Sequence, residues 1–311
     1  MSYSSDVKAE IIGHYPKSVH CKLAELAGII SVSGRNDELH NLIIRAENDA
    51  IEKKIIKLLT SLTGIKDNDI IRSNEQTHHR KLIISDKNII SEIYIKLKLS
   101  DAGTKINVDG IITERSCCKK AYLRGAFLAG GSVGSPEKSY QLEIVAVSKN
   151  EAGKLKDILS SFNLTSGVVL RRQRYVVYVK DGNSISSILG ILGAVNSLMD
   201  FENVRILKDI RNTVNREVNC DSANLAKVAN AANRQIEDIR LINEKIGIDN
   251  LPDNLQTVSR LRLEHPYLSI KELGEMLEPP LSKSAVNHRF RKLSELAEGL
   301  NKSKNDAEEN V

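Results

Sequence analysis

The stretch L-A-G-I-I-S-V-S-G, from Leu26 to Gly34, has a diluted copy later in the chain, L-R-G-A-F-L-A-G-G from Leu123 to Gly131. Each copy is predicted to form a helix. Glycines such as Gly125 and Gly130 are explained by helices that pack closely against each other, because glycine lets two backbones approach. The pair of copies indicates that the first two thirds of the chain are a duplicated unit.

Two segments of about ninety residues follow the same order of elements after these helices. The first is predicted to contain a strand-like run over Leu39–Ala46, a helix over Asp49–Leu62, a strand over Lys81–Ser85 and a helix over Lys87–Leu97. The second is predicted to contain a strand over Tyr140–Val147, a helix over Glu151–Phe162, a strand pair over Gly167–Lys180 and a helix over Ser184–Leu198. The pattern predicts an α+β fold.

Two short alignments support the duplication. L-I-I-R-A from Leu42 aligns with L-E-I-V-A from Leu142, and S-D-K-N-I-I from Ser85 aligns with K-D-G-N-S-I from Lys180. The alternative is an ordinary α+β domain with two similar halves. The common order of elements favours duplication, with the repeats at residues 1–110 and 118–215.

The two helical stretches resemble the LAGLIDADG motif of homing endonucleases, which implies a duplicated αββαββα domain. In those enzymes each motif helix ends in an acidic residue that holds a catalytic divalent cation. The corresponding positions here are Ser33 and Gly130. Neither residue supplies the anionic oxygen that Mg²⁺ requires. We therefore expect an endonuclease scaffold without catalytic residues, and no enzyme.

Composition restricts the function only weakly. The chain of 311 residues carries 45 Lys and Arg against 40 Asp and Glu, and 41% of its residues are hydrophobic. The apolar stretch Ile185–Met199 is shorter than the roughly 20 residues of a membrane span, so we interpret it as a buried helix. The first residues show no secretory signal pattern. We expect a cytoplasmic, nucleoid-associated protein that does not bind membranes.

No cofactor or metal is expected from the motifs. Cys21, Cys117, Cys118 and Cys220 show no CxxC spacing, and the adjacent pair makes a strained disulfide or a poor chelate, which favours free thiols. His78 and His79 lack a third ligand at metal-binding spacing and favour a surface strand or loop. The sequence contains no P-loop, dinucleotide fingerprint or HExxH pattern.

The final third is predicted to be helical. A connecting helix within residues 220–250 is expected to begin near Asn219, with Asp221 or Ser222 as its cap, and to end at Gly247. Its apolar positions keep a 3.6-residue period: Leu225, Val228, Ala232, Ile236, Ile239 and Ile246. The polar tail after Leu300 is predicted to be frayed.

Residues 254–300 have the layout of a helix-turn-helix domain with three short helices. Ser269 and Glu272 form a capping box at the start of the middle helix, whose Ile270, Leu273 and Leu277 share one face. The Pro279-Pro280 pair ends that helix, because proline cannot continue its hydrogen bonds. A sharp turn and a second amphipathic helix are expected to follow.

That second helix, from about Ser282, is predicted to be the DNA-recognition helix. It is expected to bury Val286, Phe290, Leu293 and Leu296. Its candidate DNA-binding residues are Lys283, Ser284, Asn287, His288, Arg289, Arg291 and Lys292. Asn and Arg pair with adenine and guanine edges, whereas Lys and Ser contact phosphates. Arg289 lies on the flank of the apolar stripe and is expected to pack or to touch a phosphate. The alternative is a solvated helix face.

A second candidate contact lies in the duplicated region. The run L-R-R-Q-R-Y-V-V-Y-V-K from Leu170 places Arg171, Arg172 and Arg174 on or beside a strand. These side chains are candidates for secondary DNA contact. A positive edge strand that discourages aggregation is the alternative.

The chain as a whole resembles the bacterial WhiA family. The resemblance rests on H-C-K-L-A-E-L-A-G from His20, A-Y-L-R-G-A-F-L-A-G-G-S-V from Ala121, N-R-E-V-N-C-D-S-A-N from Asn215 and L-S-K-S-A-V-N-H-R-F-R-K-L from Leu281. It implies a sequence-specific regulator that binds double-stranded DNA and takes part in cell division and chromosome segregation, or in sporulation. Two alternatives remain. One is an adaptor of the division machinery, with other division or regulatory proteins as partners, and the other is an active endonuclease with Asp37 or Glu143 as displaced ligands.

Overall fold

The computed structural model describes residues 2–74, 80–102 and 104–308. His78 and His79 lie outside the described residues. The chain divides into two compact units, Met1–Asp209 and Ile210–Val311. The predicted α+β class is confirmed: two similar four-stranded antiparallel sheets, a two-stranded hairpin and helices make up the first unit, and the described residues of the second unit form helices and the turns between them.

The first unit contains two four-stranded antiparallel sheets of the same topology. One sheet has the order β1-β2-β4-β3 and consists of β1 (Gly34–Asn36), β2 (Leu42–Ala46), β3 (Ile70–Asn74) and β4 (Arg80–Ile84). The other has the order β7-β8-β10-β9 and consists of β7 (Gly131–Val133), β8 (Leu142–Ala146), β9 (Gly167–Arg171) and β10 (Arg174–Val179). The identical strand order supports the duplication directly.

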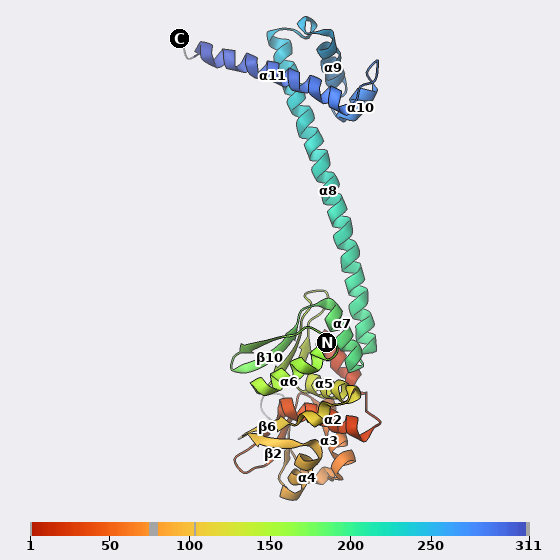
Figure 1. Cartoon of the computed structure of the whole chain (residues 1–311), viewed down its shortest axis with the longest axis vertical. Coiled ribbons are helices and arrows are strands. Elements are labelled where there is room, and N and C mark those ends of the chain that lie inside the picture. Colours follow the sequence, from red (N-terminus) through yellow and green to blue (C-terminus); the bar gives the residue numbers. More distant parts are fainter. Residues whose placement is uncertain (1, 75–79, 103, 309–311) are drawn as a thin grey trace. The chain divides into compact units, whose positions relative to one another are not determined.

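The helices of the first unit repeat in the same way. The first repeat contains α2 (Val19–Ser33), α3 (Asp49–Thr63) and α4 (Lys87–Leu97), and the second contains α5 (Ser116–Gly130), α6 (Lys149–Ser160) and α7 (Gly182–Leu192). The motif helices α2 and α5 lie between the two sheets (Figure 1). Elements outside the repeat are α1 (Tyr3–Ile12), the 3-10 turns η1 (Asp67–Asp69) and η2 (Gly110–Thr113), and the hairpin of β5 (Leu99–Ala102) and β6 (Lys105–Val108).

Both short alignments fall on equivalent elements. The aligned runs from Leu42 and Leu142 are β2 and β8, the second strands of their sheets. The aligned acids are helix caps: Asp86 accepts hydrogen bonds from backbone N–H groups at the start of α4, and Asp181 does so at the start of α7. A carboxylate at this position satisfies N–H groups that have no partner within the helix.

The motif helices touch backbone to backbone. A Cβ atom added to Gly28 would lie 2.3 Å from the carbonyl oxygen of Tyr122, and one added to Gly125 would lie 2.0 Å from that of Glu25. These two contacts are related by the duplication, because Gly28 and Gly125 hold the same motif position, as do Glu25 and Tyr122. The prediction that Gly125 serves close helix packing is confirmed. Gly130 agrees with it, since an added Cβ would meet the Val32 side chain.

A buried group of charges lies beside this contact. The Glu25 carboxylate is fully buried and forms ion pairs with Lys54 of α3, at 2.7 Å, and with Arg124 of α5, at 3.2 Å. The Lys54 ammonium also donates to the carbonyls of Ile11 and His14. Burial lowers the pKa of Lys54, while Glu25 opposes that shift. Each buried charge therefore has a partner, as burial in a low-dielectric interior requires.

Two details of the first unit differ from the prediction. The helix expected over residues 184–198 is two helices, because Gly193 adopts a left-handed φ of 87° that ends α7. A new helix, α8 (Val195–Lys245), begins two residues later. The strand-like run from Leu39 starts only at Leu42, because Asp37 accepts hydrogen bonds from Leu39 and Asn41 and holds a turn there.

The second unit is helical. It contains the later part of α8, the 3-10 turn η3 (Ile248–Asn250), α9 (Asp253–Glu264), α10 (Ile270–Glu275) and α11 (Lys283–Glu308). Its core is a separate apolar cluster formed by residues of all four α-helices, including Ile239, Val258, Leu273 and Phe290.

Three expectations for this region were wrong. The connecting helix does not begin near Asn219, because α8 continues without a break from Val195. The tail after Leu300 is helical to Glu308, since it contains no proline or glycine to stop α11. Leu296 is exposed, and Ala297 is buried in its place at the position that follows Leu293 by four residues.

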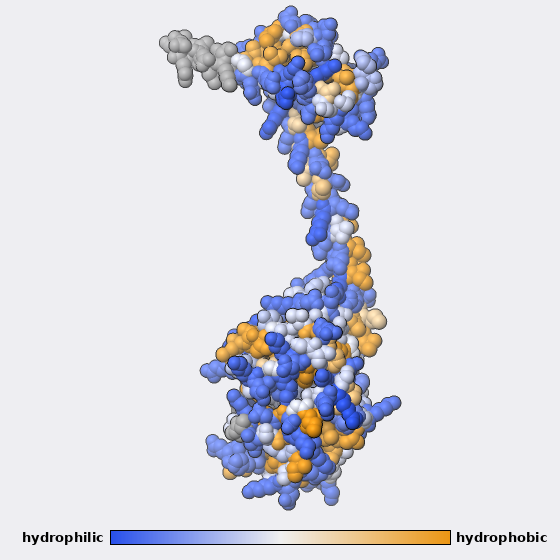
Figure 2. All heavy atoms as spheres, in the orientation of Figure 1, coloured by the Kyte–Doolittle hydropathy of each residue, from blue (hydrophilic) through white to orange (hydrophobic). Residues whose placement is uncertain are grey.

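Exposed apolar side chains lie along α8, among them Ile210, Val214, Val218 and Leu225. Figure 2 shows hydrophobic residues along this helix between hydrophilic stretches. Among the described residues, no helix is both long and apolar enough to span a bilayer.

Replacing Gly125 by alanine is expected to lower the free energy of unfolding by about 3 kcal/mol, because the added methyl overlaps a backbone carbonyl and the helices must separate. Gly153→Ala is the matched control. Gly153 lies in α6 with open space around its Cα, so alanine there should be neutral or stabilise by up to about 1 kcal/mol. Urea unfolding of both variants measures the difference, and equal stabilities would contradict the close contact.

Candidate nucleic-acid interfaces

The middle helix of the second unit begins as its sequence predicted. The Ser269 hydroxyl accepts a hydrogen bond from the N–H of Glu272, and the Glu272 carboxylate accepts one from the N–H of Ser269 at 2.7 Å. These hydrogen bonds to Ser269 are the main reason that the pKa of Glu272 is lowered. Leu273 and Leu277 are buried on the predicted face. The cap thus fixes where α10 starts relative to the core.

Helix α10 ends at Glu275, before the Pro279-Pro280 pair that was expected to end it, and the turn to α11 packs closely against Gly274. The N–H of Leu281 donates to the carbonyl of Gly274 at 2.9 Å. A Cβ atom at Gly274 would lie 2.3 Å from the carbonyl oxygen of Leu281 and 3.2 Å from the Val286 side chain. The absence of a side chain at this position therefore lets the segment around Pro279-Pro280 return tightly to α10.

A buried arginine holds the connection that precedes α10. Arg262 of α9 is 1% exposed, and its guanidinium lies 5.3 Å from the centre of the Phe290 ring. It donates to the carbonyl of Leu268 at 2.6 Å. Burial lowers the pKa of Arg262. This side chain joins α9, the loop before α10 and α11, and so sets how α11 is presented.

The face of α11 opposite the core is exposed and basic. Val286, Phe290 and Leu293 are buried, as predicted. Six of the seven predicted contact residues are exposed: Lys283, Ser284, Asn287, His288, Arg291 and Lys292. From Lys283 to Lys292 this helix contains no acidic residue. Such a face complements the phosphates and base edges of a major groove.

Part of this face borders a hollow. Ser284, Asn287, His288 and Arg291 line a space of about 450 Å³ together with Gln235 of α8. Arg291 lies 3.5 Å from Glu295 one turn later, an exposed pair that contributes little stability. The candidate base-reading residues are therefore grouped on one side of α11.

Arg289 differs from the other six. Its side chain is half-buried, and it donates to the carbonyl of Asn254 at 3.2 Å. Asn254 lies in the first turn of α9, so Arg289 packs across the domain, as its flank position predicted.

The register of the two sheets separates a helix-covered face from an open face. In the second sheet Arg171 pairs directly with Arg174, and Arg174 lies on the face opposite to Val177 and Val179, whose side chains enter the core. In the first sheet Arg45 pairs with Lys81, and Arg35 pairs with Ile43 on the same face. Because paired residues of an antiparallel sheet share a face, the open faces of both sheets carry bases.

The predicted arginines of the second sheet occupy two kinds of position. Arg171 and Arg174 end the strands of the β9–β10 hairpin, while Arg172 forms its tip with a left-handed φ of 45°. Arg171 makes an ion pair with Glu143 at 2.8 Å. β9 is also an edge strand of its sheet, so the alternative role, a positive edge that discourages aggregation, applies to the same arginines.

A hollow of about 700 Å³ lies where the motif helices end, and it is the place where the motif would require acids. Ser33 donates its hydroxyl to the carbonyl of Ile29, and Gly130 has no side chain. The hollow is lined instead by Arg35, Arg45, Lys105 and Arg174, with Glu47 paired to Lys8. These residues do not fit a catalytic divalent cation, whereas they suit an anion such as phosphate.

The carboxylates considered as displaced ligands have other partners. Asp37 accepts hydrogen bonds from the backbone N–H groups of Leu39 and Asn41. Glu143 accepts from Gln141 at 2.6 Å and binds Arg171. Both carboxylates therefore already have hydrogen-bond or ion-pair partners within their own repeat.

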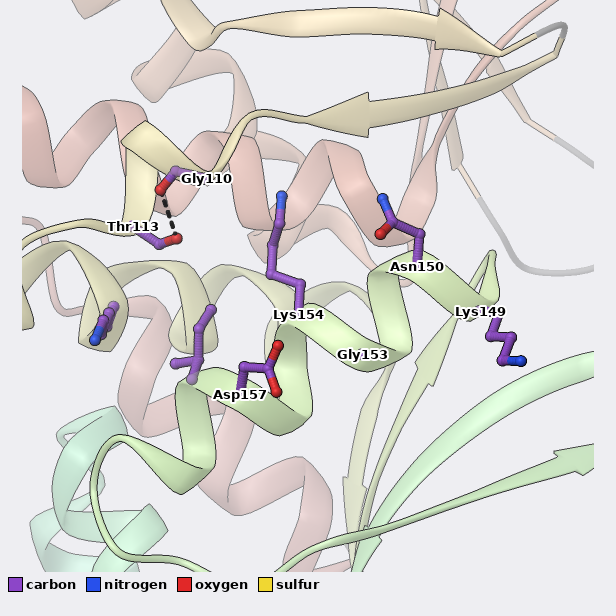
Figure 3. A pocket seen from close by; sticks show the side chains of 9 residues that line it. Gly110, Thr113, Lys149, Asn150, Gly153, Lys154 and Asp157 are labelled. Carbon is purple, nitrogen blue, oxygen red and sulfur yellow. Dashed lines mark hydrogen bonds between the residues drawn. The ribbon is translucent and has the colours of Figure 1, made fainter.

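A further hollow of about 780 Å³ lies between η2 and α6. Figure 3 shows the Lys154 side chain extending from α6, with Gly110 and Thr113 across from it. The Lys154 ammonium donates to the carbonyl of Val108 and so joins the two repeats. Burial lowers the pKa of Lys154, while Glu151 opposes that shift. The lysine serves packing between elements.

Sequence reasoning missed several residues of these surfaces. Arg35, Arg45 and Lys81 were detectable only from strand alternation, and the strand that contains Arg35 is three residues long. Arg262 gave no signal, because a buried arginine and an exposed one look alike on an amphipathic helix. Gly274 was also missed, although a glycine inside a short helix indicates close approach of another backbone.

The fold and these surfaces define a class of protein: a duplicated LAGLIDADG-like domain followed by a helix-turn-helix domain. The family description "WhiA LAGLIDADG-like domain" matches residues 119–211, and "WhiA C-terminal HTH domain" matches residues 214–297. The chain belongs to the WhiA family.

Its relatives match over nearly their full length. "Probable cell division protein WhiA" from Lachnoclostridium phytofermentans is 42% identical over 311 residues, which cover 96% of this chain and 99% of the relative. The protein of the same name from Thermoanaerobacter pseudethanolicus is 42% identical over 312 residues, covering 96% and 98%. The crystal structure of full-length DUF199/WhiA from Thermatoga maritima has a TM-score of 0.60 at 24% identity, covers 96% of this chain and 98% of that one, and shows the same fold.

Proposed function

We propose that this protein is a sequence-specific regulator that binds double-stranded DNA and acts in cell division and chromosome segregation. The observation that carries the proposal is the exposed face of α11 between Lys283 and Lys292, which contains no acidic residue and is presented by a capped α10 and a tight turn. Its relatives are named probable cell division proteins. Asn287 and Arg291 read base edges, and Lys283, Ser284, His288 and Lys292 supply further contacts to the duplex. Arg289 acts indirectly, by fixing α11 against α9.

In this proposal each domain of the chain has a separate role in DNA binding. Residues 254–300 read the DNA sequence, residues 220–250 connect, and the repeats at 1–110 and 118–215 provide a second contact with the phosphate backbone. The basic open faces of the sheets and the basic hollow at the motif-helix ends support that second contact. The protein is expected to act at the nucleoid.

A variant with Asn287, His288 and Arg291 changed to alanine is expected to lose its discrete binding sites, because all three side chains are exposed, Asn287 and Arg291 carry the base readout and His288 adds a contact to the duplex between them. Genome-wide DNA capture with purified protein, at two salt concentrations, measures the loss. Arg240→Ala is the control, since Arg240 is an exposed arginine of α8 in the same unit. Uniform binding that depends steeply on salt and is unchanged in the triple variant would contradict readout by α11.

The same triple variant distinguishes the regulator hypothesis from the alternative that the protein is an adaptor of the division machinery. A regulator loses its role in division together with DNA binding. A strain in which the triple variant binds no DNA and still divides normally would favour the adaptor.

Changing Arg171 and Arg174 to alanine is expected to reduce the salt dependence of binding while leaving the target sequence unchanged. Each lost phosphate contact lowers the slope of log K against log salt by about 0.9, so the double variant should lose about 1 to 2. Fluorescence anisotropy with a specific duplex at several salt concentrations measures it. An unchanged slope would assign these arginines to protection of the β9 edge.

We also propose that the scaffold does not cleave DNA, because the motif helices end in Ser33 and Gly130. Supercoiled plasmid incubated with the protein in Mg²⁺ or Mn²⁺ is expected to stay supercoiled. Cleavage that is abolished by a chelator and by Asp37→Asn or Glu143→Gln would revive the endonuclease alternative.

A further inference from the structure

The starts of the two motif helices carry matching pairs of metal-binding residue types. His20 and Cys21 are the second and third residues of α2, and Cys117 and Cys118 are the second and third residues of α5. Each pair lies six and five residues before the first leucine of its motif. The duplication therefore brings the pairs together when α2 packs against α5. Sequence spacing did not reveal this group, since the pairs are distant in the chain.

The ligand atoms of these four residues converge. All four lie within 4.8 Å of one another. The Nδ1 atom of His20 lies 3.2 Å from the Cys118 sulfur, 3.4 Å from the Cys21 sulfur and 3.9 Å from the Cys117 sulfur. A tetrahedron with metal–ligand bonds of about 2.0–2.3 Å has edges of roughly 3.3–3.8 Å. The three separations from His20 lie close to those edges.

Hydrogen bonding to His20 does not account for all three sulfurs: the Cys118 thiol also lies 3.8 Å from the carbonyl oxygen of His20, but for Cys21 and Cys117 the His20 imidazole is the hydrogen-bonding group within reach. The Nδ1 atom of an imidazole either donates one proton or offers one lone pair, so it satisfies one sulfur at a time. Three sulfurs nevertheless surround it. All four cysteines of the chain are unbridged, and Cys220 lies outside the group. A single cation in contact with all four atoms satisfies them together.

The ligand set selects the cation. Three thiolates and one imidazole form a soft set of the kind that structural zinc sites use, whereas Mg²⁺ and Ca²⁺ require oxygen ligands. Cys21 and Cys118 are buried, while Cys117 is exposed and leaves a route from solvent.

We propose that His20, Cys21, Cys117 and Cys118 form a structural Zn²⁺ site that joins the two repeats. The site holds the N-terminal ends of α2 and α5 together, at the opposite end of these helices from Ser33 and Gly130. It has four protein ligands and no open position, so its role is structural rather than catalytic.

Metal analysis of the full chain, purified without a histidine tag, tests this proposal. We expect about one zinc ion per chain to remain after exhaustive dialysis. Elemental mass spectrometry measures the zinc content. Cys117→Ser removes an exposed ligand and should weaken zinc binding by more than the roughly 10- to 100-fold that loss of an outer-shell partner costs. Cys220→Ser removes the exposed cysteine of α8 and should keep the full zinc content.

Two further measurements keep the proposal testable if a variant folds poorly. Co²⁺ added to the metal-free chain should give the intense visible absorption of tetrahedral thiolate coordination, altered in His20→Ala and retained in His20→Cys. A strong chelator should lower the melting temperature of the wild-type chain and not that of Cys117→Ser.

Three outcomes would overturn it. These are a metal-free chain that also fails to bind Zn²⁺ when it is added, a disulfide among Cys21, Cys117 and Cys118 in protein purified under reducing conditions, and equal zinc content in the Cys117→Ser and wild-type chains. None of them affects DNA readout by α11, so the two proposals fail independently.

Discussion

The first unit depends on the contact between the backbones of α2 and α5. Gly28 and Gly125 allow each helix to reach a carbonyl of the other, closer than any side chain would permit. The two contacts are equivalent under the duplication, so each repeat contributes the same glycine and the same carbonyl position to the interface between α2 and α5. The sheets, helices and loops of each repeat are then positioned from this shared axis, and the strand orders of the two sheets match.

Charge is organised around the same axis. The buried Glu25 carboxylate joins Lys54 and Arg124, and these in turn bind carbonyls of the N-terminal segment and of the end of α7. Removing one member would leave a buried charge without its partner, which costs more than the pair contributes. The network thus links elements that are far apart in the chain to the helix pair.

The two ends of the helix pair have opposite chemistry. At the C-terminal ends, where a LAGLIDADG enzyme requires acids, Ser33 and Gly130 leave a hollow lined by bases. At the N-terminal ends, a histidine and three cysteines gather. Ser33 and Gly130 offer no anionic ligand for a hard cation, and the bases that line the hollow suit an anion such as phosphate.

The sequence by itself determined the duplication, the α+β class, the missing acids and the layout of the helix-turn-helix domain. Local patterns carry all of these: the repeated motif, the Ser269 cap and the apolar period of α11. Tertiary structure alone decided which sulfurs meet His20, which bases share the open sheet faces, and that Arg262 is buried beneath α11. These relations join residues that are distant in the chain, and no local pattern records the packing of helices and the pairing of strands that bring them together.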